Sequence, residues 1–133
     1  MTHPTGVISL SSDRDVQAAC ARLEAAIAAR GMTLFAKVDH GEGAREVGMD
    51  LRPTVLFVFG AAKGGTPLMQ EDQILGLDLP LKALVWQDAQ GATRIGYVDP
   101  RWIVELRGLS PQAAAIAERL QAMLAGLAQE AAG

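Results

Sequence analysis

The chain has 133 residues, half of them apolar and a fifth charged, with a formal net charge of −3. This length and balance fit a globular protein with its own core, and we expect a single domain over residues 1–133. The negative charge argues against nucleic acid as a partner, since affinity for a phosphate backbone comes mainly from Lys and Arg.

Three features of the sequence indicate the cellular compartment of the protein. Cys20 is the only cysteine, so no intrachain disulfide can form. The N-terminus lacks the basic start and apolar run of a signal peptide. The longest apolar tract, residues 113–128, is interrupted by Glu118 and Arg119 and does not resemble a membrane span. We therefore expect a cytoplasmic protein without a membrane partner.

The first elements are a strand and a long helix. Residues 6–10 indicate a short strand, and Ser11-Ser12 can cap a helix over residues 13–30. Gly31 supplies the glycine that commonly follows a helix end. The buried face of this helix is predicted by apolar residues spaced four, three and four apart: Val16, Cys20, Leu23 and Ile27.

Two strands are expected next, separated by an irregular segment. Residues 32–38 alternate, with Met32, Leu34, Ala36 and Val38 on one face. The segment at 39–53 has room for a helical turn near residues 44–47. Residues 54–59 are continuously apolar, which predicts a central strand covered on both faces.

A glycine-rich loop follows at residues 60–66. Thr66 can act as a helix cap and Pro67 suits the first helical position, so we expect a short helix and turn over residues 68–76.

Residues 81–88 and 93–99 predict a hairpin. A two-residue turn at Gln90-Gly91 and a four-residue loop at 89–92 both place Asp88 opposite Thr93. The same pairing places three side chains on one face opposite three others: Trp86 and Ile95, Leu84 and Tyr97, and Lys82 and Asp99.

Two helices are expected at the C-terminal end. Asp99-Pro100 ends the strand and opens a short helix over residues 100–106. Ser110-Pro111 opens a long one over residues 111–129. The resulting prediction is an α+β fold, with a curved, mainly antiparallel sheet packed against two long amphipathic helices at 13–30 and 111–129.

The glycine-rich loop is the strongest candidate binding site. Glycines between a strand and a helix expose N–H groups that can hold an anion, and Lys63 adds a positive charge. The order Lys63-Gly64-Gly65-Thr66 differs from a nucleotide-binding P-loop, in which the lysine follows the last glycine. The alternative interpretation is a plain tight turn.

Other polar residues allow further hypotheses. His40 lies near acidic residues but lacks the three or four converging ligands of a zinc site, so we predict no metal site. It could serve as a general acid or base. Lys82 and Asp99 form either a weak surface ion pair or part of a ligand site with Tyr97. Cys20 is expected to be an inert core residue.

Several segments together resemble the DUF302 family, a domain of unknown function. They are Asp39-His40, residues 51–54 and 59–60, Lys63-Gly64-Gly65-Thr66-Pro67-Leu68-Met69-Gln70, residues 76–82 and 85–86, and Tyr97-Val98-Asp99-Pro100. The resemblance covers nearly the whole chain. It implies a compact α+β fold with a curved antiparallel sheet, often found as a dimer, and no established activity.

The resemblance also suggests one shared surface, which supplies the candidate ligand-binding residues His40, Lys63, Gly64, Thr66, Lys82, Tyr97 and Asp99. The leading hypothesis is a domain that binds a small anionic or metal-containing ligand in a cleft near the 60–66 loop. One alternative is an enzyme using His40 as acid or base with Lys82 and Tyr97. Another is a dimerisation module acting through an edge strand or the C-terminal helix. The sequence identifies no cofactor.

Overall fold

The computed structural model describes residues 5–133, which form an α+β fold around a five-stranded sheet. The strands lie in the order β1-β5-β4-β3-β2, and each neighbouring pair is antiparallel, which confirms the expected fold class. In chain order the elements are β1 (Val7–Ser12), α1 (Val16–Ala29), β2 (Thr33–Asp39), α2 (His40–Glu46), β3 (Thr54–Gly60), α3 (Ala62–Glu71), the 3-10 helix η1 (Gln73–Leu77), β4 (Leu81–Gln87), β5 (Thr93–Val98), α4 (Pro100–Leu106) and α5 (Pro111–Ala132).

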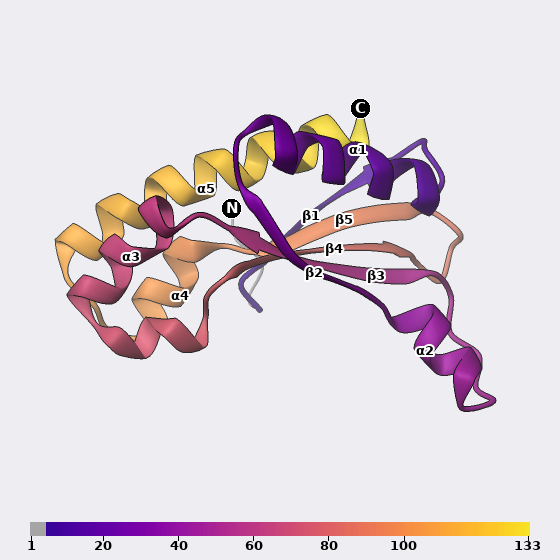
Figure 1. Cartoon of the computed structure of the whole chain (residues 1–133), viewed down its shortest axis with the longest axis horizontal. Coiled ribbons are helices and arrows are strands. Elements are labelled where there is room, and N and C mark those ends of the chain that lie inside the picture. Colours follow the sequence, from indigo (N-terminus) through magenta and orange to yellow (C-terminus); the bar gives the residue numbers. More distant parts are fainter. Residues whose placement is uncertain (1–4) are drawn as a thin grey trace.

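Helices cover only one face of the sheet. In Figure 1, α1 and the C-terminal part of α5 lie side by side above the strands, and α2 projects beyond the far end. Phe57, Val85 and Ile95 are fully buried between the sheet and these helices. The alternate residues of the same strands, such as Leu56 and Leu84, point to the other side of the sheet and are only half-buried. We call this other side the open face.

The long helix α5 belongs to two cores. Its C-terminal half packs with α1 and the sheet, and an ion pair of 2.7 Å between Arg30 and Glu130 joins the two helices. Its N-terminal half packs with α3, η1 and α4 around a second cluster: Leu68, Leu75, Val104, Ala113, Ala117 and Leu120. The helical end of the molecule is therefore held to the sheet through α5.

None of the helices between residues 5 and 133 combines the length and hydrophobicity needed to cross a bilayer, and this includes the 22-residue α5.

The two long helices form where the sequence predicts them, with one difference in capping. The cap of α1 is Asp15, whose carboxylate accepts from the amide of Ala18 at 2.7 Å, rather than Ser11-Ser12. Ser12 remains in β1 and its hydroxyl donates to the carbonyl of Ala132 at 2.7 Å. Ser110 caps α5 as expected, and the helix continues to Ala132.

The predicted alternation of residues 32–38 is wrong beyond Phe35. A bulge between Leu34 and Ala36 shifts the register, so Lys37 faces the helices, opposite Phe57. Its ammonium nitrogen lies 5.5 Å from the centroid of the Phe57 ring. An extra residue in one strand reverses the face of every residue after it.

The expectation that residues 54–59 are covered on both faces is also wrong. Phe57 and Phe59 are completely buried, whereas Leu56 and Val58 are half-buried on the open face. A continuous apolar run can therefore belong to a strand with one face packed and the other accessible.

The hairpin register differs by one residue from the prediction. Gln87, rather than Asp88, is opposite Thr93, and Trp86 is opposite Arg94. The connecting loop is longer than either turn considered, because the amide of Asp88 donates to the carbonyl of Ala92 at 2.8 Å and residues 88–92 all belong to the loop. The predicted Lys82–Asp99 pair does not form.

Asp99 instead anchors α4 to the sheet. Its side chain is completely buried and accepts from the amide of Arg101 at 2.9 Å, which caps the helix. The Arg101 guanidinium also binds both carboxylate oxygens, at 2.8–3.1 Å. The backbone amide of Asp99 donates to the carbonyl of Gly6 at 2.8 Å. This residue therefore joins β5, α4 and the start of β1.

Removing the Asp99 carboxylate is expected to destabilise the protein strongly. Asp99→Ala should lower the free energy of unfolding by about 2–3 kcal/mol, because it removes the cap of α4 together with charge-assisted hydrogen bonds to a fully buried carboxylate. The matched control is Asp72→Ala, which removes the cap of η1 from a more accessible position and should cost about 0.5–1 kcal/mol. Urea unfolding of both variants measures the difference, and equal losses would contradict an anchoring role for Asp99.

Candidate functional site

A mostly apolar cleft lies beside the predicted loop. Its volume is about 300 Å³, and one wall is formed by Gly60, Ala61, Ala62, Gly64, Gly65 and Thr66. Met69 of α3 also lines the cleft, and the other walls come from β2, η1 and α5 and include Phe35 and Met123. The backbone at Gly65 lies close to Leu79, since a Cβ added there would be in van der Waals contact with Cδ1 of Leu79, at 3.5 Å.

The segment expected to be a loop is largely helical. The cap of α3 is Ala61, and Thr66 and Pro67 lie inside the helix, so the predicted helix start at Thr66-Pro67 is wrong. The amides of Gly64 and Gly65 both donate to the carbonyl of Ala61, at 3.0 and 3.1 Å. Gly64 and Gly65 therefore do not present free donors to an anion.

The first turn of α3 offers a different anion-binding feature. No side chain within residues 5–133 caps this helix, so the N–H groups at its start lack the usual side-chain acceptor. Ala62 lies in this first turn and lines the cleft. Lys63 follows it, exposed to solvent and without an ion pair among residues 5–133.

His40 lies away from this cleft. It is exposed at the start of α2, the helix that projects from the sheet in Figure 1. The carboxylate of Asp39 caps that helix by accepting from the amide of Glu42 at 2.9 Å. Within residues 5–133, no three His, Cys, Asp or Glu side chains come together as a metal site would require.

Lys82 and Tyr97 lie on opposite faces of the sheet. Tyr97 is buried in the core under the helices, and this burial raises the pKa of its phenol. Lys82 belongs to the open face, opposite Val58. The hypothesis of one catalytic site with His40, Lys82 and Tyr97 is therefore wrong.

The strand register also separates His40 from Lys82. Asp39, the neighbour of His40, is in register with Val55, and Val55 with Val85. Lys82 is three residues further along β4, so the backbones differ by about 10 Å along the strands and about 10 Å across them. Of the residues predicted to share one surface, Gly64 and Thr66 line the cleft, and Lys63 is their neighbour in the chain.

Cys20 is a core residue, as expected. It is buried on α1, and burial raises the pKa of its thiol to about 11. A thiol with such a pKa is almost entirely protonated near neutral pH and is a poor nucleophile.

A second cavity, which no sequence pattern predicts, lies on the other side of Leu79, Leu81 and Leu120 from the cleft. Its walls come from residues between Leu68 and Leu124, which approach only through the packing of α4, α5 and η1. No local pattern could indicate a cavity assembled in this way.

Comparison with known proteins places this fold in a family. The family model of DUF302, a domain of unknown function, matches residues 8–127. The crystal structure of an uncharacterised conserved DUF302 protein from Bacillus stearothermophilus superimposes with a TM-score of 0.86, covering 95% of this chain and 98% of that one. The sequence identity is 22%, so this likeness shows the fold alone.

Curated relatives carry a more specific name. The chain is 39% identical over 105 residues to a protein named fluoride-specific ion channel FluC 1 from Brucella suis, and equally so to a FluC 1 from Brucella abortus. The match covers 79% of this chain but only 41% and 39% of those proteins, so the chain spans about two fifths of their length. Because the DUF302 family model matches residues 8–127, which is most of the chain, the chain belongs to the DUF302 family.

Proposed function

We propose that this domain binds a small ligand with an apolar body and an anionic end, in the cleft beside residues 60–66. The observation that carries the proposal is the cleft of about 300 Å³, which ends at an uncapped helix start. Met69 and Met123 provide adaptable apolar surface for the body of the ligand. The first-turn amides of α3 and Lys63 would meet the negative charge.

The names of the curated relatives add one alternative ligand. Those proteins are named for fluoride, a small anion without an apolar part. A fluoride ion would need the helix start but not the apolar walls. The apolar lining therefore favours an amphipathic anion over fluoride, and the two can be separated by experiment.

The buried, unpaired cysteine and the absence of a membrane-spanning helix in residues 5–133 suit the reducing cytoplasm, which we propose as the compartment.

Binding in the cleft can be tested with hexanoate as the probe and NMR as the readout. We expect saturable shifts at the amides of Ala62 and Lys63 together with the methyl groups of Met69 and Met123. Lys63→Met should weaken binding about threefold, as expected for an exposed charge contact. The control Lys82→Met, on the open face, should leave the affinity for this cleft unchanged.

Two results would contradict this proposal. Shifts at Ala62 and Lys63 with fluoride alone, and none with hexanoate, would identify the helix start as a simple anion site. Shifts spread evenly over the surface, with none at Met69 or Met123, would show that the cleft is not a binding site.

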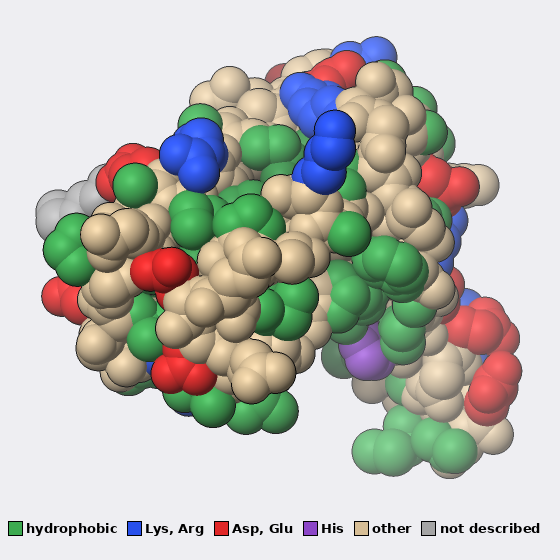
Figure 2. Space-filling view, turned by 60° about the vertical axis from the view of Figure 1, so that its left-hand side comes forward, with side chains coloured by type: hydrophobic (Ala, Val, Ile, Leu, Met, Phe, Trp, Pro, Cys, Tyr) green, Lys and Arg blue, Asp and Glu red, His purple; other side chains and the backbone are tan. Residues whose placement is uncertain are grey.

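We also propose that the open face pairs with a second copy of the chain. Trp86 lies on this face in the central strand β4, against Gly96, where an added Cβ would come within 3.0 Å of the indole ring. Val38 and Val98 are partly exposed on the same face. Figure 2 shows the surface hollowed between the body of the molecule and the projecting end, with apolar side chains lining the hollow.

The projecting segment carries the complementary features. Residues 40–53, here called the arm, expose Val47, Met49 and Leu51. Glu46 and Asp50 add negative charge and make no ion pair within residues 5–133. The open face carries Lys82 and Arg94, which likewise lack a carboxylate partner there.

A two-fold axis between the two open faces would bring these features together. If the axis ran across the strands, each arm would lie over the opposite end of the partner's sheet, near Lys82. The same surface would then serve both copies, as in most homodimers. The buried contact of α5 with α1, α3 and α4 leaves the C-terminal helix less suited to this role than the open face.

The dimer can be tested by sedimentation over a wide concentration range. We expect Met49→Glu to weaken self-association by about tenfold or more, because it places a charge in an apolar contact. Met49 is 65% exposed, so this change should not unfold the monomer. The matched control Ala25→Glu, at an exposed position of α1 on the opposite side, should behave as the parent protein. A strict monomer at every concentration would contradict the proposal.

A further inference from the structure

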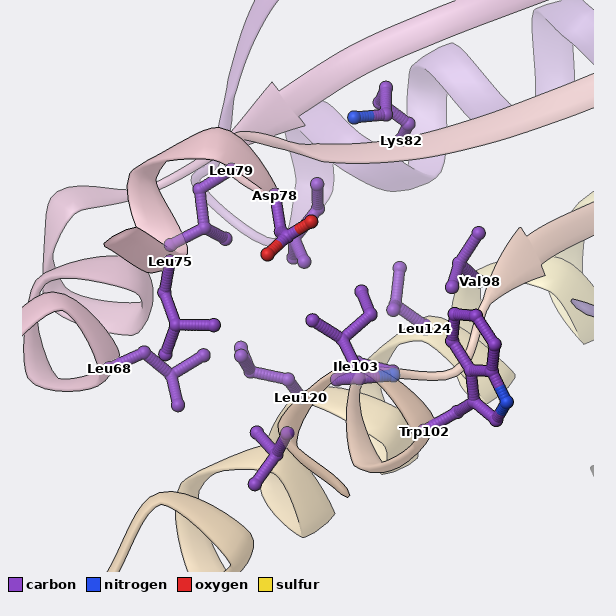
Figure 3. A pocket seen from close by; sticks show the side chains of 13 residues that line it. Leu68, Leu75, Asp78, Leu79, Lys82, Val98, Trp102, Ile103, Leu120 and Leu124 are labelled. Carbon is purple, nitrogen blue, oxygen red and sulfur yellow. The ribbon is translucent and has the colours of Figure 1, made fainter. Parts of the chain in front are cut away.

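A second cavity of about 210 Å³ lies between the end of the sheet and the helices α4 and α5. Figure 3 shows side chains from η1, α4, α5 and the strand ends surrounding it. Leu75 and Leu124 belong to its lining and are almost fully buried, at 1% and 2% exposure. The cavity is therefore a hollow in the packed interior that reaches the surface, and it is separate from the cleft beside α3.

One wall is aromatic and held in place by the backbone. Trp102 lines the cavity, and its indole ring lies against Gly6, where an added Cβ would be 2.3 Å from Cδ2. Gly6 has a φ of +79°, so glycine suits this position for both its backbone and its lack of a side chain. The indole is thus a fixed flat surface beside the cavity.

The polar groups of the cavity leave one positive charge without a counter-ion. Asp78 and Lys82 belong to the lining, and both are visible in Figure 3. The Asp78 carboxylate already binds the guanidinium of Arg107 through two contacts of 3.0 Å. The Lys82 ammonium makes no ion pair within residues 5–133. A ligand that complements this cavity therefore carries a negative charge.

We propose that this second cavity binds a small aromatic monocarboxylate, with its ring beside Trp102 and its carboxylate on Lys82. The flat indole surface suits an aromatic ring, which packs on tryptophan in offset or edge-to-face geometry. The apolar floor favours the body of the ligand, and the uncompensated ammonium favours a single negative charge. The site uses Lys82, and it does not depend on the cleft beside α3.

The cavity can be tested with 4-fluorobenzoate, followed by fluorine NMR. In the variant Trp86→Phe, Trp102 is the only tryptophan and reports binding by its fluorescence. Saturable binding with a change in Trp102 fluorescence is expected. Lys82→Met should weaken binding about tenfold, as loss of a charge-assisted hydrogen bond would, whereas Lys82→Arg should retain most of the affinity.

Two controls separate this site from the cleft. Lys63→Met should leave the affinity for 4-fluorobenzoate unchanged. The neutral analogue 4-fluorobenzyl alcohol should bind the parent protein and Lys82→Met with the same affinity. Ile103→Trp, at a half-buried position of the lining, should fill the cavity and abolish binding. Binding that is weakened by Lys63→Met but not by Lys82→Met would overturn this proposal while supporting the cleft. Unchanged Trp102 fluorescence at saturation would also overturn it.

Discussion

The register of the β4–β5 hairpin decides which chemistry each face of this protein can offer. Asp88 sets that register, because its carboxylate accepts from the amides of Gln90 and Ala92 at 3.0 and 2.9 Å and folds a five-residue loop. With this loop, Val85 and Ile95 face the helices and enter the core. Lys82 and Trp86, at the alternate positions of β4, face the open side. A shift of one residue between β4 and β5 would place Ile95 and Tyr97 on that open side as well.

Much of the fold follows from local signals in the sequence. The apolar spacing of α1 and the Ser110-Pro111 start of α5 predict both long helices, and Asp99-Pro100 predicts α4 over its observed range. These signals succeed because capping and periodic burial are decided within a few residues. The strands are likewise found close to their observed ranges.

The relations between strands could not be predicted in the same way. Both turns considered for the hairpin place Asp88 opposite Thr93, and the longer Asp88 loop differs from them by one residue. The bulge in β2 has no distinctive residue type to indicate it, and it reverses the face of Lys37. Register depends on contacts across the sheet, so a local pattern leaves it undetermined.

The candidate site, like the fold, depends partly on local sequence signals and partly on contacts between distant segments. Gly64 and Gly65 line the cleft, but their amides donate to the carbonyl of Ala61 and are not the free anion donors that the glycine-rich pattern predicts. Thr66-Pro67 suggests a helix start, yet the helix begins at Ala62, and Leu68 is buried in the second core. Tertiary packing therefore overrides the local capping signal. The cavity beside Trp102 has no sequence signal, because its lining extends from Leu68 to Leu124.

These features describe a DUF302 domain whose sheet separates two environments. The helix side is closed by α1 and α5, whereas the open side presents Lys82 and Trp86 for contact with a ligand or a second copy. The register of β4 with β5 decides which β5 side chains join each side of the sheet. Nuclear Overhauser effects between backbone protons of β4 and β5 test it most directly. The account predicts cross-strand contacts that pair Val85 with Ile95 and Gln87 with Thr93. Contacts that pair Trp86 with Ile95 and Asp88 with Thr93 would contradict it.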